Sequence, residues 1–332
     1  MGGAGGRQLY AVPGGIMKVR HRGESLKDRK AGYPLSARDD RDLPDGFDGP
    51  VFVWDIDKTY LTTHFSSLRG LSRIPLEFAV DKQAVPGMPA LLRGLRRGPG
   101  PGYACAPLYF VSGSPPFLRR VIETRMLLDG VEHDGITFKD WVGTLRQGRP
   151  GRLREQVGYK VCALLTGRLR WPQAVEYLFG DDVEQDARAF DLYAGIVEGR
   201  LSAGETVAGL AEAGVPRYDR RNVFALLDRL PSRRGRVARI FIHLVRNTPP
   251  FRFEPYGGRV VPVRSAFQLG LALYELSLVD RQAVDQARGA VFGTTNVPAY
   301  ALQDQARDAV ERGVVGRETL ARLNESGEDP PA

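Results

Sequence analysis

Three short apolar runs along the chain each end in polar side chains. They are VFVWDIDKT (51–59), LYFVSGSP (108–115) and VEYLFGDD (175–182). A continuous apolar run of this length is typical of a strand that is buried on both faces of a parallel sheet. Because the carboxyl ends of parallel strands meet at one edge, where open α/β sheets bind ligands, we expect the polar residues that end these runs to be neighbours in space.

Strand and helix patterns alternate through the middle of the chain. Strands are predicted at 51–55, 107–111, 175–179 and 237–245 with a further segment at 136–141, and helices near 88–96, 115–128, 158–168 and 223–230. This alternation favours an α/β fold with a doubly wound parallel sheet flanked by helices. The pattern from about residue 262 onward is helical only, with helices predicted near 264–278, 280–291, 298–311 and 316–324.

The same patterns suggest three regions. Residues 1–50, rich in Gly, Asp and Arg, are expected to form a lead-in segment, with a hairpin favoured around 9–19. Residues 51–262 carry the alternating elements and are expected to form the core. Residues 263–332 are expected to form a helical C-terminal extension packed on that core.

Membrane-spanning and disulfide-rich classes do not fit the sequence. The apolar stretch AFQLGLALYELSL (266–278) is well short of the roughly 20 residues that span a bilayer. The N-terminal MGGAGGRQLYAVPGG lacks the apolar segment of a secretory signal. Cys105 and Cys162 form no Cys-x-x-Cys pair and have no histidine cluster nearby, so neither a disulfide framework nor a zinc site is indicated. We therefore predict a cytoplasmic protein.

The net charge of +8 comes almost wholly from arginine, with 40 Arg against 7 Lys. Arginine-rich stretches lie at 93–97, 146–154 and 229–239, flanked by Gly and Pro. Such runs are most often solvated loops, but they leave open a peripheral contact with an anionic membrane or another polyanion. No obligate nucleic-acid partner is predicted, and the pattern does not indicate an oligomeric state.

Acidic residues gather after the first and third apolar runs. Asp55 and Asp57 lie at the end of the first, and GDDVEQD brings Asp181, Asp182 and Asp186 to the same predicted rim. Two carboxylates about 4 Å apart repel by on the order of 4 kcal/mol at an effective dielectric near 20, so a proton or a cation is expected between them. Oxygen ligands with few histidines favour Mg²⁺ as that cation.

The second run and one lysine supply groups that suit a phosphate. Ser112 precedes Gly113, Ser114 and a predicted helix start, so its hydroxyl and the following N–H groups can form a phosphate nest. Lys160 lies near the start of another predicted helix, where its charge can neutralise phosphoryl oxygens. An Asp carboxylate can attack phosphorus to give an aspartyl-phosphate, while a second carboxylic acid protonates the leaving oxygen and later activates water.

These residues carry a resemblance to a known family. DIDKT (55–59), VSGSP (111–115), Lys160 within GYKVCALL, and GDDVEQD (180–186) resemble the four ordered motifs of the haloacid dehalogenase (HAD) superfamily of phosphohydrolases. More narrowly, VSGSPPFLRRVIETRMLLDGVEHDGITFKDW, GDDVEQDARAFDLYAGIV and RIFIHLVRN are similar to the phosphatidate phosphatase catalytic-domain family. The likeness covers roughly residues 51–280, most of the chain.

The resemblance implies a Rossmann-like parallel sheet flanked by helices, an activity and a set of roles. Asp55 would be the nucleophile and a side-chain ligand of Mg²⁺, and Asp57 would be the general acid and base and bind the metal through its carbonyl oxygen. Thr59 would brace the loop next to the phosphate, and Ser112 and Lys160 would hold the phosphoryl group.

The remaining implied roles concern the metal and the substrate. Asp181 with Asp186 would serve the Mg²⁺. The expected substrate is a phosphorylated small molecule or a phospholipid, and the narrower resemblance suggests phosphatidate. The sequence departs from the narrower family at Lys58, where Asp is usual, and in the extra helix-like sequence at 203–230, which concerns substrate access.

Two other functions are weighed against this hydrolase. In one, Ser112 or Ser114 is a hydrolytic nucleophile, although VSGSP lacks the Gly-x-Ser-x-Gly elbow. In the other, the basic chain is a catalytically silent module that binds an anionic membrane surface or nucleic acid. The paired Asp55 and Asp57 argue against the silent module, because a binding module does not need two acids in its pocket.

Overall fold

The structure is a computed structural model that describes residues 33–62, 83–146, 148, 155–232, 234–295 and 299–325. The hairpin predicted at 9–19 lies outside the described residues, as does most of the arginine-rich stretch at 146–154. The strands are β1 (Leu35–Asp39), β2 (Pro50–Asp55), β3 (Leu108–Ser112), β4 (Gly135–Lys139), β5 (Val175–Asp181), β6 (Arg236–His243) and β7 (Val260–Val263).

Helices connect these strands and extend the chain beyond the last of them. Those between strands are α3 (Met88–Arg97), η1 (Pro116–Leu118), α4 (Arg119–Leu128), α5 (Trp141–Arg146), α6 (Val157–Arg168), α7 (Asp186–Val197), α8 (Ala203–Glu212), α9 (Arg217–Leu227) and η3 (Pro250–Tyr256). After β7 come α10 (Ala266–Glu275), α11 (Arg281–Thr295), α12 (Ala299–Glu311) and α13 (Arg317–Glu325).

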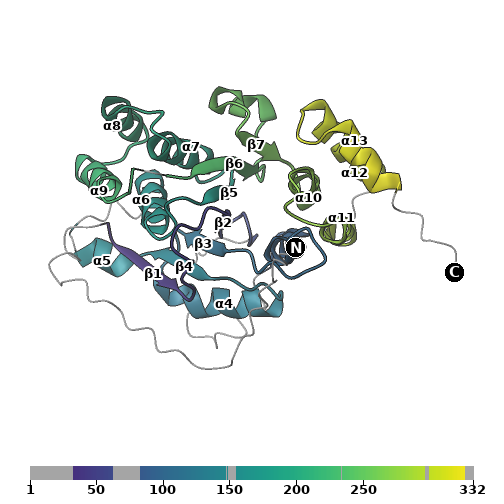
Figure 1. The fold of residues 1–332 in the computed structure, drawn as a ribbon, viewed down its shortest axis with the longest axis horizontal. Helices are drawn as coiled ribbons and strands as arrows, with labels where there is room; N and C mark the ends of the chain where they lie inside the picture. Colours follow the sequence, from purple (N-terminus) through teal and green to yellow (C-terminus); the bar gives the residue numbers. More distant parts are fainter. Residues whose placement is uncertain are drawn as a thin grey trace, which may run out of the picture. The chain divides into compact units, whose positions relative to one another are not determined.

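The strands form one seven-stranded sheet in the order β1-β4-β3-β2-β5-β6-β7 (Figure 1). Neighbouring strands in the part of this order from β4 to β7 all pair in parallel, and the edge strand β1 is antiparallel to β4. The prediction of an α/β fold with a parallel sheet flanked by helices is therefore confirmed, except that β1 adds an antiparallel strand at one edge. The chain builds outward from β2 through β3 to β4, then returns to place β5 on the other side of β2, so the strand order reverses between β2 and β5. Such a switch point is where open α/β sheets hold their ligands.

Both faces of the sheet are buried, which explains the continuous apolar runs. Alternate residues of β2 point to opposite faces: Phe52 and Trp54 join one core cluster, and Val51 and Val53 join the other. The Trp54 ring stacks on Phe179 of β5 with centroids 4.1 Å apart, which ties the neighbouring strands together on the first face. Helices α3, α4, α10 and α11 cover that face, and α6 and α7 cover the other.

The four C-terminal helices lie where the pattern after residue 262 predicts helices. α10 packs on α11, and α11 packs on α3, so the C-terminal helices share the core of the first sheet face. Gly94 of α3 allows this close approach, because a Cβ there would lie 2.5 Å from the Ala283 side chain of α11. None of the described helices is long and apolar enough to cross a membrane.

The structure differs from the sequence prediction at both edges of the sheet. β1 lies within the segment expected to be a lead-in, and β7 lies where no strand is predicted. The helix predicted from residue 115 begins instead with the 3₁₀ turn η1, and its α-helical part starts at Arg119. Pro115 is in an extended conformation, as is usual for a residue that precedes another proline.

Candidate active site

The carboxyl ends of the three central strands β2, β3 and β5 carry the candidate residues. Asp55 is the last residue of β2, Ser112 the last of β3 and Asp181 the last of β5. Lys160 lies in the first turn of α6, and Asp186 is the first residue of α7. The described structure thus brings these five residues, far apart in the sequence, to the switch point of the sheet.

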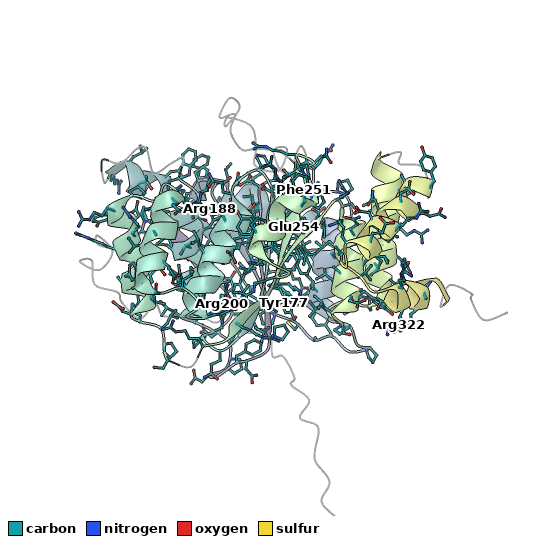
Figure 2. The ribbon with its side chains drawn as sticks, turned by 90° about the horizontal axis from the view of Figure 1, so that it is seen from above. Tyr177, Arg188, Arg200, Phe251, Glu254 and Arg322 are labelled. Atoms are coloured by element: carbon teal, nitrogen blue, oxygen red, sulfur yellow. The ribbon has the colours of Figure 1, made fainter. Side chains whose placement is uncertain are left out.

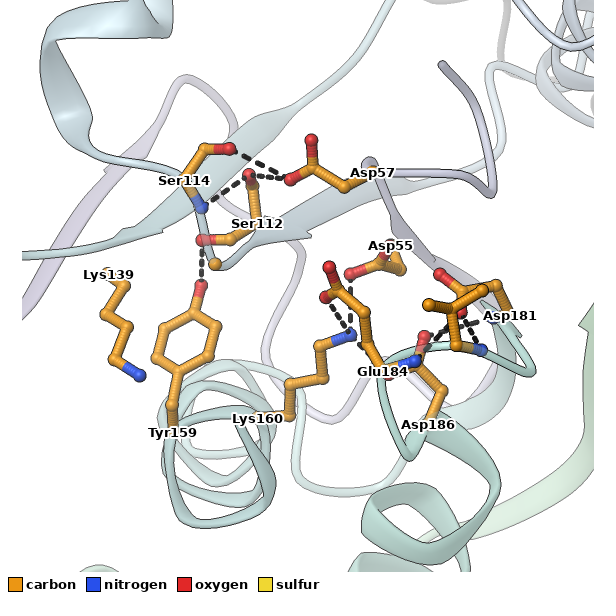
Figure 3. A network of polar contacts seen from close by, with 12 residues as sticks. Asp55, Asp57, Ser112, Ser114, Lys139, Tyr159, Lys160, Asp181, Glu184 and Asp186 are labelled. Carbon is orange, nitrogen blue, oxygen red and sulfur yellow. Dashed lines mark hydrogen bonds and ion pairs between the residues drawn. The ribbon is translucent and has the colours of Figure 1, made fainter. Parts of the chain in front are cut away.

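Lys160 is the centre of a buried charge cluster (Figure 3). Its Nζ lies 2.8 Å from Asp55 Oδ1 and 3.4 Å from Glu184 Oε2, and it also contacts Asp186 Oδ1. The side chains of Lys160, Asp55 and Asp186 are at most 1% exposed. One ammonium group therefore faces three carboxylates, two of which are buried as fully as the lysine itself.

Asp181 adds a further acid to this cluster. Ligand oxygens of Asp55, Asp181 and Asp186 lie within 4.8 Å of one another. The Asp181 Oδ1 atom accepts the main-chain N–H groups of Val183 and Glu184, which closes the turn after β5. Its other oxygen, Oδ2, is buried and accepts no hydrogen bond from the described residues, as is also true of Asp55 Oδ2.

Gly180 lets the cluster form at this spacing. The Asp186 Oδ2 atom accepts the main-chain N–H of Asp181 at 3.1 Å, so the first turn of α7 folds back over the end of β5. A Cβ at position 180 would lie 2.4 Å from that same carboxylate oxygen. Glycine is the residue that permits this approach, which accounts for the G in GDDVEQD.

Asp57 forms a second group beside the cluster, held by two serines. Its Oδ2 accepts the hydroxyl of Ser114 at 2.9 Å and that of Ser112 at 3.2 Å (Figure 3). The Ser112 hydroxyl in turn accepts the Ser114 main-chain N–H at 3.1 Å. The other oxygen of Asp57, Oδ1, is buried and has no hydrogen-bond partner among the described residues. The two serine hydroxyls therefore orient Asp57, and their role in holding a phosphoryl group stays a prediction.

The loops around these acids are built to hold them. A tight turn follows β2: the N–H of Lys58, which has the left-handed φ of 65°, donates to the Leu61 carbonyl oxygen at 2.6 Å. Thr59, in the same turn, is buried, and its hydroxyl has no partner among the described residues. Trp141 Nε1 donates to the Gly113 carbonyl oxygen at 3.0 Å, which fixes the serine loop from α5.

Burial and the closeness of like charges raise the pKa values of these acids above their ordinary values. Burial raises the pKa of Asp181 to about 8, reinforced by Asp186 and opposed by Lys160. Burial likewise raises the pKa of Asp55 well above its usual value, although Lys160 opposes the shift. The pKa of Asp57 rises to about 6 through burial and the charge of Glu184, while its serine hydrogen bonds oppose the rise. These acids are thus costly to ionise together, which favours a bound cation.

The structure corrects one predicted metal ligand. Asp182 does not join the cluster: its carboxylate accepts the main-chain N–H groups of Arg246, at 2.9 Å, and Thr248, at 3.2 Å. Successive residues at the end of a strand point to opposite sides, so only one of two adjacent acids can face the cluster. Asp182 instead secures the loop after β6.

Two contributors were not singled out from the sequence. Glu184 lies within the quoted GDDVEQD motif, and its acidic character was the signal available. Tyr159 gave no such signal. Its hydroxyl lies 2.5 Å from the Ser112 carbonyl oxygen and 3.0 Å from that of Thr137, so it ties α6 to the ends of β3 and β4.

Comparisons of the sequence with protein-family models and with curated proteins, and of the structure with solved structures, found no match.

Proposed function

We propose that this protein is a Mg²⁺-dependent phosphomonoester hydrolase of the HAD type, which acts through an aspartyl-phosphate. One observation carries the proposal: buried acids outnumber the lysine that they surround, and oxygens of Asp55 and Asp181 have no partner in the described part of the chain. A buried charge without compensation is costly, so such an arrangement is retained where a ligand supplies the missing charge.

The donor set fits Mg²⁺. Asp55 and Asp181 each offer a buried carboxylate oxygen that accepts no hydrogen bond from the described residues, and hard oxygen donors suit this ion. Asp186 is the third acid of the group, but Lys160 and the Asp181 N–H already occupy its two oxygens. When bound, the ion would neutralise charge on the phosphoryl oxygens and on the acids around it.

In the first step, a carboxylate oxygen of Asp55 attacks phosphorus, and the bond from phosphorus to the ester oxygen breaks. The product is an acyl phosphate on Asp55 and a free alcohol. Asp57 supplies the proton that the departing oxygen needs, through Oδ1, the oxygen not engaged by the two serines. The Lys160 ammonium offsets the charge that the phosphoryl group brings into the site.

In the second step, water attacks the phosphorus of the acyl phosphate. The phosphorus–oxygen bond to Asp55 breaks, which restores its carboxylate and releases inorganic phosphate. Asp57, now ionised, takes the proton from the attacking water and returns to its starting state. Because Ser112 and Ser114 hold one oxygen of Asp57 in place, the same carboxyl group can serve in both steps.

For the substrate we propose a phosphomonoester, either a phosphorylated small molecule or a phospholipid such as phosphatidate. The resemblance of residues 51–280 to the phosphatidate phosphatase catalytic-domain family motivates the lipid.

The test is a panel of phosphomonoesters, including phosphatidate in detergent micelles, incubated with the purified protein and Mg²⁺. We expect phosphate release that a chelator abolishes and that Asp55→Asn lowers at least about 10⁴-fold. Binding of anionic vesicles or nucleic acid without turnover of any substrate would contradict the proposal and favour the silent module.

Asp181→Asn and Asp182→Asn form a matched pair, because the two acids are adjacent but only Asp181 belongs to the cluster. We expect Asp181→Asn to raise the Mg²⁺ concentration needed for half-maximal activity at least about tenfold. Asp182→Asn is expected to leave that concentration unchanged. Equal effects of both substitutions would contradict the assigned donors.

A further inference from the structure

The strand β6 brings a histidine to the edge of the sheet that carries the candidate site. Its last residue is His243, which lies opposite Asp181, the last residue of β5. Figure 2 shows Phe251, which follows β6, in the upper half of the view and Tyr177, near the start of β5, in the lower half. His243 is partly buried at this carboxyl edge.

The ring of His243 contacts the turn that carries Asp57. Its Nδ1 atom lies 3.3 Å from the carbonyl oxygen of Lys58, the residue after Asp57. Because a carbonyl oxygen can only accept, this contact is a hydrogen bond when Nδ1 carries a hydrogen. Burial lowers the pKa of His243, although the Lys58 carbonyl opposes the shift, so the neutral ring with a single N–H is favoured. The contact therefore specifies which ring nitrogen holds that hydrogen.

Lys58 has a backbone conformation that residues with a side chain rarely adopt. Its φ of 65° lies in the left-handed region, which is costly for any residue except glycine. Its N–H donates to the Leu61 carbonyl oxygen at 2.6 Å, within the turn. Its own carbonyl oxygen accepts no other hydrogen bond from the described residues than that of His243. The unfavourable conformation is thus held from two sides, by the turn and by β6.

The main chain at Lys58 determines where Asp57 lies. Ser112 and Ser114 hold the Oδ2 atom of Asp57 from the β3 side, but they do not hold the main chain that bears this carboxylate. A change of Lys58 to the right-handed region would rotate the adjoining peptide group and shift Asp57 relative to the serines. A displacement of about 1 Å in a reacting group can lower a rate by about 10²-fold.

We propose that His243 is a positioning residue for Asp57. By donating its Nδ1–H to the Lys58 carbonyl oxygen, it holds the turn in the conformation that places Asp57 against the departing oxygen of the substrate. This role rests on the proposed function, because it concerns the proton that Asp57 gives to the leaving group. The hydrogen bond itself can be measured without any turnover, so the two statements can fail separately.

The first measurement is an NMR spectrum of the full chain with ¹⁵N-labelled histidine, of which the sequence has four. The signals of His243 are identified by their loss in His243→Asn. We expect the neutral His243 ring to carry its hydrogen on Nδ1. A neutral ring with its hydrogen on Nε2 would overturn the proposal, whatever the activity of the protein.

The second measurement compares three substitutions on two substrates. His243→Leu removes the donor, His243→Asn keeps an amide N–H at about the place of Nδ1, and His243→Gln places its amide at about the place of Nε2. The substrates are phenyl phosphate and p-nitrophenyl phosphate with Mg²⁺, which are close in size. The p-nitrophenolate ion leaves without a proton, whereas phenolate depends on the proton from Asp57. We compare kcat/KM, which covers the steps up to release of the alcohol.

We expect His243→Leu and His243→Gln to lower kcat/KM at least about tenfold for phenyl phosphate and less than about threefold for p-nitrophenyl phosphate. His243→Asn should keep both values within about threefold of wild type. If His243→Leu does not fold, the Asn and Gln variants provide the same comparison.

Equal losses on the two substrates would overturn the proposal, because a merely structural role does not distinguish leaving groups. An unchanged kcat/KM for phenyl phosphate in His243→Gln would overturn it as well. Wild-type protein that turns over no phosphomonoester would overturn the hydrolase and with it the role of His243 in proton transfer. A hydrogen on Nδ1 in such a protein would still confirm the hydrogen bond to Lys58.

Discussion

Two buried charge clusters lie at opposite ends of the same three elements. At one end of β5, α6 and α7 are Asp181, Lys160 and Asp186 of the candidate site. At the other end the same elements place Glu176, Arg168 and Tyr193 together. The side chains of Arg168 and Glu176 are at most 1% exposed, as buried as those in the site.

The second cluster is balanced and fully hydrogen-bonded around its carboxylate. Glu176 Oε2 accepts Arg168 at 2.5 Å and Tyr193 at 2.6 Å, and Oε1 accepts Trp171 Nε1 at 2.8 Å. Arg168 also donates to the Ala174 carbonyl oxygen at 2.7 Å. Two equally buried clusters can therefore have different roles. A cluster whose charges and hydrogen bonds are all paired stabilises the fold, whereas an excess of acids with partnerless oxygens indicates a ligand site.

The two clusters should differ most in whether loss of an acid lowers activity or stability. Asp55→Asn tests this in the candidate site. Turnover should fall at least about 10⁴-fold because the substitution removes the proposed nucleophile. The free energy of unfolding of the metal-free protein should not fall, because Asp55 is an acid whose pKa burial raises and Lys160 keeps Asp186 and Glu184 as partners. Phosphate release and urea unfolding measure the two quantities. A destabilisation of several kcal/mol would place Asp55 with the structural acids.

Glu176→Gln should have the opposite effect. It leaves Arg168 buried without its counterion, which costs about 3–5 kcal/mol of unfolding free energy. Activity per folded molecule should stay at the wild-type level, since Glu176 lies at the far end of β5 from the site. Asp304→Asn, which removes an exposed ion pair with Arg307, is the control and should change stability by less than about 0.5 kcal/mol. A small effect of Glu176→Gln would remove the distinction between the clusters.

The central strands and the acids at their ends could be predicted from the sequence, because a strand buried on both faces needs apolar residues along most of its length. β2 is a continuous apolar run from Val51 to Trp54, and β5 is apolar apart from Glu176 until each strand ends in an acid. Parallel pairing then requires that Asp55 and Asp181 share an edge. Burial of a parallel sheet on both faces thus explains both the apolar runs in the sequence and the convergence of their carboxyl ends.

The edges of the sheet could not be predicted in this way. β1, with the sequence LSARD, is only partly buried, and its antiparallel pairing with β4 is a long-range contact that gives no local signal. β7, VVPV, has four residues and contains a proline, which argues against a strand except at an edge. The choice between Asp181 and Asp182 depended on the β6 loop, whose N–H groups take up the second acid.

Magnesium should stabilise the protein more at pH 8 than at pH 6. An acid whose folded pKa is raised stabilises the folded state fully below its unfolded value, and this contribution is lost as the pH rises through the folded value. For Asp181 the loss extends from about pH 4 to its pKa of about 8 in the metal-free protein. Because the ion binds the ionised form, the Mg²⁺-dependent stabilisation should grow by up to about 1.4 kcal/mol per pH unit for each proton displaced.

Thermal unfolding with and without Mg²⁺, at matched ionic strength, measures this stabilisation. Asp182→Asn should keep the pH-dependent increment, and Asp181→Asn should lose most of it. Glu176→Gln should keep it despite a lower melting temperature. An increment that is independent of pH would show that the ion does not compete with protons for these carboxylates.

The smallest effect on kinetics is expected from substitution of Glu184. This substitution distinguishes two roles for the additional carboxylate beside Lys160. Its carboxylate lies 3.4 Å from Lys160 Nζ, and its side chain is 14% exposed, more open than the other acids there. If Glu184 mainly repels an incoming phosphate, Glu184→Gln should lower KM for a soluble phosphomonoester about fivefold, which corresponds to roughly 1 kcal/mol, with kcat nearly unchanged. If it mainly holds Lys160 in place, KM should rise instead. Glu254→Gln, at an exposed acid of η3, is the control for a general change in surface charge and should leave both constants unaltered.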